Sequence, residues 1–440
     1  MQILTKREFI ITVTSNLNNK ITIMCLNIFK KNKMNTILIL GAGASVPFYS
    51  PRLSTSHLTN VISDQKKWTN LVTRYTNIMG QNVNMVNVQA ILQVLNNITQ
   101  SHPNYNFEQI IEIYDKISSF NFDPRPNSKI LHDILLLYNA TAHNIPNHVW
   151  DCVPFLFRQI ITEELEDLHT NHKTALYNNL TQLQTDFISN IYNGQSFNIF
   201  TLNYDEIILD AIQNLNIDNG FNNQGRFDIN TFLSASKTIS FPHGHSRFSF
   251  DDDDILYHPN SHTANTYRLN NIAAINRTQT KYLTDSSYSY SFNTFISTGQ
   301  QKEPTFDVNP YSIYYQKFAS DCLKANKIYL IGYSFSDPHF NRMLLNFLQI
   351  SPLNKIIVVD YLPGNINIKT EYMTQGSFIY KMLKQLGVKS LPLDVSGNNY
   401  LYQQKEQDLN NLGYSEIYPQ IFFYKNGYDT FLSQFNTIRI

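Results

Sequence analysis

Three polar side chains in this 440-residue chain, His243, Asn203 and Asp205, are of types that could act together in catalysis. A neutral histidine can take a proton from water or a hydroxyl, because the ordinary imidazole pKa of about 6.5 suits neutral pH. The asparagine amide offers both a donor and an acceptor for positioning a substrate. The aspartate could place negative charge beside a developing cation. Each also has an ordinary structural explanation, since His-Gly pairs are common in turns and Asn and Asp often cap helices.

A glycine-containing segment, GAGAS at 41–45, follows the apolar and β-branched residues 36–40. Those five residues are too few for a helix and predict a strand buried on both faces. Gly41 and Gly43 would let the backbone turn sharply and approach a bound group. If a helix begins near Ser45, its N-terminus would suit a pyrophosphate. The alternative is an ordinary strand-to-helix turn, and the third glycine of the dehydrogenase fingerprint is missing.

Further strands are predicted where short apolar runs recur, at 197–202, 238–241, 327–331, 355–359 and 420–424. Helical patterns separate several of them, and we expect Ser336 or Asp337 to cap the helix that contains Phe340. Strands that alternate with helices predict a parallel α/β sheet, whose ligands bind at the carboxyl ends of the strands. The segments TLNYD at 201–205, PHG at 242–244 and GYSFSD at 332–337 should therefore meet the glycine turn at one edge.

The region of about 86–190 has helical spacing of apolar residues and separates the glycine turn from the next strand by about 150 residues. This length predicts a large α-helical insertion, not a simple crossover helix. Residues 1–33 are predicted to be a loosely held N-terminal extension, and 34–440 to be one nucleotide-binding domain. The four aspartates at 251–254 are expected in a solvated turn, with a divalent-metal site as a weaker alternative.

The composition excludes several classes of protein. The 34 basic and 34 acidic residues cancel, so no overall field attracts nucleic acid or an anionic membrane. No apolar run reaches the length of a membrane span. Three widely spaced cysteines suit a reducing cytoplasm and cannot form a four-cysteine zinc site, and we expect no bound metal.

Taken together, GAGAS at 41–45, TLNYD at 201–205, PHG at 242–244 and IGYSFSDPHF at 331–340 resemble the Sir2 family. The resemblance is closer to the SIR2-like branch of bacterial anti-phage systems than to protein-deacylating sirtuins, and it spans about residues 34–360. It implies a Rossmann-like parallel sheet of the Sir2 type that binds NAD as a substrate. It also implies a reaction that begins with cleavage of the nicotinamide–ribose bond.

The resemblance assigns roles residue by residue. His243 matches the catalytic histidine, Asn203 the residue that orients the nicotinamide ribose and an attacking water, and Asp205 a residue of the nicotinamide pocket. The residues that would bind the rest of NAD are Gly41, Ala42, Gly43, Ser45, Thr201, Gly332, Ser334 and, as a looser match at a strand end, Asp360. His245 stands where the family often has serine, and it could assist catalysis or only fill space.

The departures from sirtuin deacylases favour hydrolysis of NAD to nicotinamide and ADP-ribose. The zinc module cannot form, and the glycine turn continues as VPFYSPRLST instead of a segment with a Phe-Arg pair. The alternatives are an NAD-dependent deacylase or ADP-ribosyltransferase, or a non-catalytic sensor of ADP-ribose-type nucleotides, and a cyclic ADP-ribose product also stays open.

The resemblance further implies a toxic effector that depletes NAD in an infected cell, as in abortive infection. Such an activity must be gated. We expect a cytoplasmic homo-oligomer or a regulatory partner, such as an ATPase, a nucleic-acid sensor or a phage protein, with the helical region as the contact surface.

Overall fold

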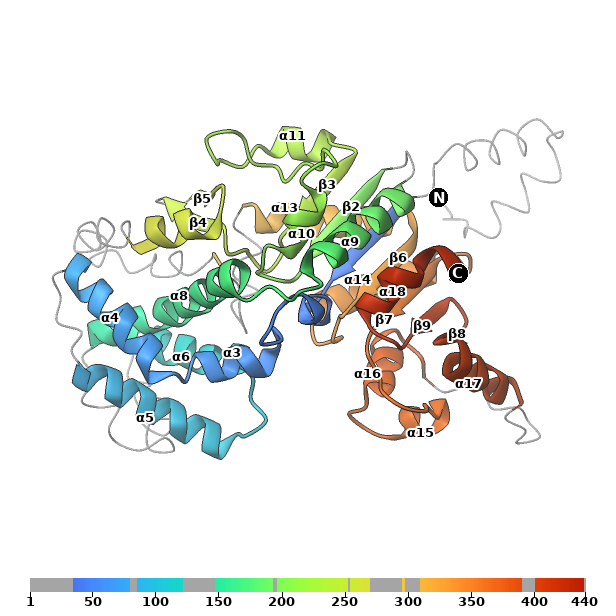
Figure 1. Ribbon diagram of the computed structural model, residues 1–440, viewed down its shortest axis with the longest axis horizontal. Coiled ribbons are helices and arrows are strands. Elements are labelled where there is room, and N and C mark those ends of the chain that lie inside the picture. Colours follow the sequence, from blue (N-terminus) through green and yellow to red (C-terminus); the bar gives the residue numbers. More distant parts are fainter. Residues whose placement is uncertain are drawn as a thin grey trace, which may run out of the picture.

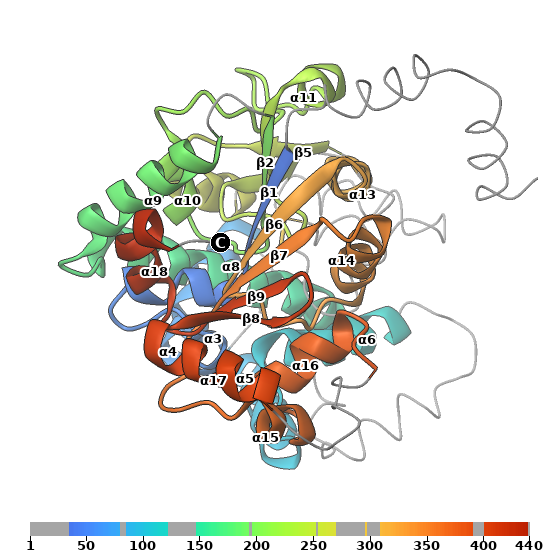
Figure 2. The same cartoon turned by 90° about the vertical axis from the view of Figure 1, so that its right-hand side faces the viewer.

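The computed structural model describes residues 35–79, 85–121, 147–192, 196–251, 254–269, 295–296, 309–389 and 400–438. The predicted N-terminal extension, residues 1–33, lies outside these ranges. The chain folds as an α/β structure in which a twisted central sheet has helices on both faces (Figures 1 and 2). Within the described ranges, no helix combines the length and apolar character needed to cross a membrane.

The described residues form a seven-stranded sheet with the strand order β3-β2-β1-β6-β7-β9-β8. All neighbouring strands are parallel except β8, which runs antiparallel to β9. The strands are β1 (Asn35–Leu40), β2 (Phe197–Thr201), β3 (Lys237–Ser240), β6 (Ala325–Ile331), β7 (Lys355–Val359), β8 (Tyr414–Tyr418) and β9 (Ile421–Tyr424). The predicted mostly parallel sheet is therefore confirmed, and its arrangement is compatible with a Rossmann-like fold.

The strand order reverses between β1 and β6. From β1 the chain adds β2 and β3 on one side, and later adds β6, β7 and β9 on the other. Such a reversal separates the loops that leave the two central strands and opens the crevice where α/β proteins bind ligands. The fold therefore places the candidate ligand site after Leu40 and Ile331.

The register aligns the strand ends. Leu40 lies opposite both Thr201 and Ile331, and Ile331 lies opposite Val359. Because all four strands are parallel, the segments that follow them leave the sheet at one edge and at one level. The predicted convergence of polar segments at this edge follows from that alignment.

Strand β1 is buried on both faces. Leu38 and Leu40 belong to one apolar cluster, whereas Ile37 and Ile39 belong to another, because successive side chains of a strand point to opposite faces. Burying each such side chain stabilises the fold by about 1.5–3 kcal/mol. The apolar run therefore holds β1 at the centre of the sheet.

Helices cover each face. Helices α9 (Tyr177–Tyr192), α10 (Ile207–Ile212) and α18 (Tyr428–Gln434) pack on the face of Leu38 and Leu40. Helices α13 (Tyr311–Cys322), α14 (Pro338–Ile350), α15 (Ile368–Met373) and α16 (Phe378–Gln385) contribute to the cluster of Ile37 and Ile39 (Figure 2). The remaining elements at the C-terminal end are α17 (Tyr400–Leu412) and the short turn η7 (Phe435–Thr437).

Between β1 and β2 the described residues are largely helical. The helices are α3 (Thr55–Val61), α4 (Gln65–Met79), α5 (Met85–Ser101), α6 (Phe107–Asn121) and α8 (Asn147–Asn171), followed by α9. Helices α3 to α8 form a group at one end of the molecule (Figure 1). The helical character predicted for 86–190 is confirmed for the described residues of that range, and helix formation already begins at Thr55.

A short helix precedes β3, and a small hairpin follows it. Strands β4 (Phe248–Asp251) and β5 (Asp254–Tyr257) pair antiparallel with Asp251 opposite Asp254, and α11 (Ile229–Ser234) precedes β3. Asp252 and Asp253, the middle of the predicted aspartate turn, lie outside the described residues. In the part of the chain that the structure describes, no group of three or more His, Cys, Asp and Glu side chains could hold a metal ion.

Candidate functional site

The loops that follow β1 and β6 touch backbone to backbone. The N–H of Gly41 donates to Ile331 O at 2.8 Å, and the N–H of Gly43 donates to Gly332 O at 3.0 Å. A Cβ atom on Gly41 would lie 2.5 Å from Gly332 O, and one on Gly332 would lie 2.2 Å from Ala44 N. Gly332 also has a φ of 61°, which disfavours any side chain. The glycines therefore allow two loops to meet at the reversal point of the sheet.

The segment after the glycine turn differs from the helix considered above. Residues Ala42–Ala44 and Val46–Phe48 form two short 3₁₀ turns, η1 and η2, and the first α-helix begins only at Thr55. The N–H of Ser45 donates to Ala42 O at 3.2 Å and that of Phe48 to Ser45 O at 3.1 Å, which are the three-residue hydrogen bonds of 3₁₀ turns. No α-helix begins at Ser45, so the condition under which a helix dipole would supply an anion site there is not met.

A buried polar cluster joins the β1 and β2 loops. Asn203 Nδ2 donates to Gly41 O and to Ser45 Oγ, each at 2.9 Å. Ser45 Oγ in turn donates to Asp205 Oδ2 at 2.5 Å. All three side chains are buried. The predicted residues Ser45, Asn203 and Asp205 therefore lie together, and their hydrogen bonds run in one direction toward the carboxylate.

The other end of the Asn203 amide is unsatisfied. Asn203 Oδ1 is buried and accepts no hydrogen bond from any residue that the structure describes. Leaving a buried acceptor unpaired costs about 1–3 kcal/mol, so natural folds rarely keep one without a reason. Thr201, fully buried at the end of β2, accepts a hydrogen bond from the Asn203 N–H at 3.2 Å and holds the backbone of this loop. The cluster thus fixes the amide and leaves Oδ1 without a hydrogen-bond partner among the described residues.

Asp205 is a buried carboxyl group. Burial raises its pKa to about 6, although hydrogen bonds from Ser45 and from the N–H of Ile207 favour the ionised form. The group is mainly ionised at neutral pH and becomes neutral in mild acid.

His243 lies at the end of β3 and pairs with an aspartate of the β6 loop. Its Nε2 lies 2.9 Å from Asp337 Oδ2, and both residues are only 4% exposed. The other carboxylate oxygen of Asp337 accepts from the N–H groups of His339 and Phe340 at 2.9 Å and 3.2 Å, and so caps α14. The prediction that Ser336 or Asp337 caps this helix is confirmed, with Asp337 as the cap.

His245 has a structural role. Its Nε2 donates to Asp205 O at 2.8 Å, and its Nδ1 accepts from the N–H of Arg247 at 3.1 Å. Burial, together with the charge of Arg247, lowers its pKa to about 3. Since both ring nitrogens are engaged and the ring stays neutral, His245 ties the β3 loop to the β2 loop. This geometry favours the space-filling alternative over assistance in catalysis.

The remaining predicted residues line the same edge but differ in exposure. Ala42 is exposed at the tip of the glycine turn, and Ser334 is exposed with its hydroxyl 3.1 Å from that of Ser336. Asp360 directly follows β7 and accepts from the N–H of Tyr361 at 2.7 Å, while burial raises its pKa to about 6. Within the described ranges, neither Ser334 nor Asp360 forms a hydrogen bond with the Asn203 cluster.

Sequence reasoning missed a second ion pair beside this cluster. Glu206 Oε2 lies 2.6 Å from Arg247 Nη2, and Glu206 Oε1 accepts from the N–H of Ser261 at 2.8 Å. Burial alone would raise the pKa of Glu206, but the bond and charge of Arg247 lower it to about 2. Glu206 directly follows TLNYD and Arg247 lies three residues after PHG, and that proximity was the one signal that could have found them.

The helical group also reaches the site. Tyr204 lies between Asn203 and Asp205, and its hydroxyl donates to Glu108 Oε1 of α6 at 3.1 Å. Tyr204 and Glu108 therefore connect the catalytic candidates to a helix that precedes them by nearly a hundred residues.

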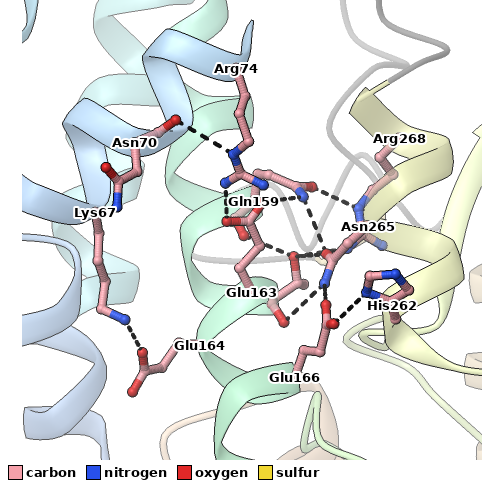
Figure 3. A network of polar contacts seen from close by, with 11 residues as sticks. Lys67, Asn70, Arg74, Gln159, Glu163, Glu164, Glu166, His262, Asn265 and Arg268 are labelled. Carbon is pink, nitrogen blue, oxygen red and sulfur yellow. Dashed lines mark hydrogen bonds and ion pairs between the residues drawn. The ribbon is translucent and has the colours of Figure 1, made fainter.

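Two open grooves lie elsewhere, along α8. One of about 560 Å³ is lined by Lys67, Asn70, Thr73, Arg74, Ile160, Glu163 and Glu164, and a smaller one of about 320 Å³ includes Glu166 and His262. Figure 3 shows their polar side chains, which come from α4, from α8 and from the helical segment 261–269. None of these residues belongs to the predicted site.

The charges along these grooves are paired. Arg74 contacts Glu163 at 2.5 Å, His262 contacts Glu166 at 2.7 Å, and Lys67 contacts Glu164 (Figure 3). The fully buried Arg268 donates to Gln159 Oε1 at 2.9 Å, and burial lowers its pKa to about 9. This network joins helices, whereas the converging polar groups at the sheet edge define the candidate site.

No protein-family model matches this chain, and no curated protein matches it.

Proposed function

We propose that this chain is an NAD glycohydrolase with a SIR2-like site, which cleaves NAD to nicotinamide and ADP-ribose. The observation that carries the proposal is the fixed amide of Asn203, whose Nδ2 is held by Gly41 O and Ser45 Oγ while its buried Oδ1 has no partner. An unpaired acceptor at the carboxyl edge suits a ribose hydroxyl or a water molecule. The four motifs that resemble the SIR2-like branch lie at this same edge, which supports the proposal further.

The proposed reaction breaks the glycosidic bond between C1′ of the ribose and the nicotinamide nitrogen. That bond's electron pair leaves with nicotinamide, which becomes neutral, and positive charge develops on the ribose as in glycoside hydrolysis. A water oxygen bonds to C1′, and its proton passes to His243. Asn203 orients the ribose hydroxyls and the water, and Asp205 supplies negative charge near the cation.

The proposal places the remainder of NAD along the loops that follow β1, β6 and β7. Gly41, Ala42 and Gly43 would contact the phosphates through the backbone, and Gly332 and Ser334 would line the phosphates and a ribose. Asp360 would accept from the adenosine ribose hydroxyls. The exposure of Ala42 and Ser334 supports this placement, because a ligand can reach both.

In this proposal the fold is of the Sir2 type, and helices α3 to α8 are an insertion into it. The resemblance assigns the protein to anti-phage defence by NAD depletion in the cytoplasm. Its activity would then be controlled by self-association or by a partner protein. The Tyr204–Glu108 contact offers a physical link between such a helical surface and the catalytic loop.

The test is to incubate the purified protein with NAD, alone and with lysate from phage-infected cells, and to separate the products by chromatography. The wild type should release nicotinamide and ADP-ribose in equal amounts, and Asn203→Ala should release neither. If the products are cyclic ADP-ribose, or protein that carries ADP-ribose, the enzyme cleaves the same bond but does not transfer the ribose to water.

A matched control is Asn198→Ala, which removes a buried asparagine of β2, the strand that precedes Asn203. Asn198 Nδ2 donates to Asp321 Oδ2 at 2.7 Å, and its Oδ1 accepts from Thr238 at 2.6 Å. Both the nitrogen and the oxygen of this amide therefore hold neighbouring elements together. This variant should melt at a lower temperature but retain turnover below that temperature. Equal turnover by Asn203→Ala and the wild type would overturn the proposal.

A further inference from the structure

We infer that Asp337 is a positioning residue that sets the tautomer and orientation of His243, an inference that rests on the proposed function. The 2.9 Å contact between His243 Nε2 and Asp337 Oδ2 joins the β3 loop to the β6 loop across 94 positions of the chain. Both side chains are 4% exposed, so water does not compete freely for the contact. A buried carboxylate at this distance accepts a strong hydrogen bond from an imidazole N–H.

The two carboxylate oxygens of Asp337 have different hydrogen-bond partners. Oδ1 accepts from the N–H groups of His339 and Phe340 at the start of α14, and Oδ2 faces His243. Helix α14 has 13 residues, and the positive end of its dipole favours the ionised carboxylate. The helix therefore anchors Asp337 and keeps its carboxylate ionised, so that the carboxylate can accept a hydrogen bond from an imidazole N–H.

The loop that carries Asp337 is itself fixed. The hydroxyl of Tyr333 lies 3.1 Å from Asp337 O and 2.8 Å from Asn341 Oδ1, and Asn341 Nδ2 donates to Phe335 O at 2.9 Å. Phe335 has a φ of 55°, which costs about 1–2 kcal/mol for a residue with a side chain. Buried contacts thus hold a strained loop in the one shape that directs the carboxylate at His243. Phe340 adds an edge-on ring contact to the imidazole at 6.2 Å between centroids.

The chemical consequence follows from the tautomer. An Nε2–H that donates to Asp337 leaves the basic lone pair on Nδ1, so Nδ1 is the atom that takes the proton of the attacking water. As this proton arrives, the ring becomes an imidazolium, and the ionised Asp337 stabilises the new charge without itself being protonated. The same arrangement of a carboxylate behind a catalytic histidine has evolved on unrelated folds.

The central variant is Asp337→Asn. Asparagine caps helices about as well as aspartate, so the fold and the start of α14 should persist. Its amide is neutral and can donate as well as accept, so it no longer specifies the Nε2–H tautomer. We expect kcat for NAD cleavage to fall by about 10²–10⁴-fold while KM stays near the wild-type value. A purely structural role would instead lower the melting temperature and leave kcat of the folded fraction unchanged.

Asp228→Asn is the matched control. Asp228 also caps a helix, and its Oδ1 accepts from the N–H groups of Asn230 and Thr231 at 3.0 Å and 3.2 Å. This variant should retain wild-type kcat and KM. If Asp337→Asn fails to fold, Asp337→Ser keeps a capping oxygen with a shorter reach and should show the same loss of kcat.

A spectroscopic measurement separates this inference from the proposed function. Nitrogen-15 NMR of histidine-labelled protein, with His243 assigned by its absence in His243→Gln, reports the ring tautomer without any turnover. The wild type should show Nε2–H at His243, and Asp337→Asn should shift the ring toward Nδ1–H or a mixture. If the wild type does not cleave NAD, the proposed function fails. The NMR measurement of the His243 tautomer still tests whether Asp337 accepts a hydrogen bond from Nε2–H. An unchanged tautomer, or an unchanged kcat in an active Asp337→Asn protein, would overturn the inference.

Discussion

Ser45 Oγ donates a hydrogen bond of 2.5 Å to Asp205 Oδ2, although 160 positions separate the two residues. The same hydroxyl accepts from Asn203 Nδ2 at 2.9 Å. A hydroxyl has one proton, so donation to the carboxylate leaves its lone pairs for the amide. Asp205 therefore fixes the direction of the Ser45 hydroxyl, and Ser45 fixes the Asn203 amide with Oδ1 turned away from both.

Ser45→Ala should reduce NAD cleavage by up to about 10²-fold, because an amide held by Gly41 O alone can tilt away from its working orientation. The loss should appear mainly in kcat. The variant also removes a hydrogen bond that favours ionised Asp205, so the pKa of this carboxyl should rise further. Steady-state kinetics and thermal unfolding measure both effects.

Ser334→Ala is the control for that variant. Ser334 is exposed, and its hydroxyl lies 3.1 Å from that of Ser336. Its removal should leave kcat unchanged and affect at most the KM for NAD. A Ser45→Ala enzyme with wild-type kcat would show that the serine does not position Asn203.

Asp205 should make the protein more stable in mild acid. Its pKa is raised from 3.8 to about 6 by burial, so the folded state takes up a proton that the unfolded state still lacks between about pH 6 and pH 4. Stability therefore increases as the pH falls through this window, by up to about 3 kcal/mol. Above pH 6 this contribution is absent.

Urea unfolding of the wild type and Asp205→Asn at several pH values isolates this effect, because other titrating groups are common to both proteins. The free energy of unfolding of the wild type should rise relative to the variant as the pH falls from 7 to 4. A difference that stays constant with pH would mean that Asp205 has an ordinary pKa in the fold.

The sheet could be predicted because its inner strands are short apolar runs, and Lys355–Val359 has the predicted bounds. The edge strand β8 could not be found in this way. In Tyr414–Tyr418 only Ser415 and Ile417 are buried, so no apolar run marks the strand. Its place depends on pairing with β9, which is a tertiary contact.

The grouping of side chains at the candidate site was predictable where the residues share a motif and not where they pair across the chain. Asn203 and Asp205 are neighbours of one strand end. Asp337, in contrast, was predicted only as a helix cap, because nothing in the sequence indicates which side chain its second oxygen meets. At Ser45 the chain forms short 3₁₀ turns where the glycine turn lies against the backbone of Gly332, a contact that the sequence alone does not indicate.

Gly332→Ala should prevent folding or destabilise the protein by several kcal/mol, whereas Gly364→Ala should cost only about 1–2 kcal/mol. Both glycines have positive φ, 61° and 78°, so the conformational strain is alike. A Cβ atom on Gly332 would meet Ala44 N at 2.2 Å, but one on Gly364 has nothing within 4 Å. Soluble yield and urea unfolding of the two variants therefore measure the contact between the β1 and β6 loops. Similar stabilities would show that this contact relaxes at little cost.

Arg247→Met should destabilise the protein by about 3–5 kcal/mol at neutral pH, because it leaves the buried Glu206 without its partner. The pKa of Glu206 is lowered to about 2, so the ion pair's contribution is present above about pH 4.5 and is lost as the pH falls through 2. The defect of Arg247→Met should accordingly shrink in strong acid.

The double variant Glu206→Gln with Arg247→Met tests the cause, since it removes the unpaired charge together with its partner. We expect it to recover part of the lost stability, because a neutral amide can still accept from the N–H of Ser261, as Glu206 Oε1 does at 2.8 Å. Urea unfolding of all four proteins gives the coupling energy between the two side chains. A coupling near zero would mean that Arg247 stabilises the β3 loop by packing against Tyr257, whose ring centroid lies 5.9 Å from its guanidinium, and not through Glu206.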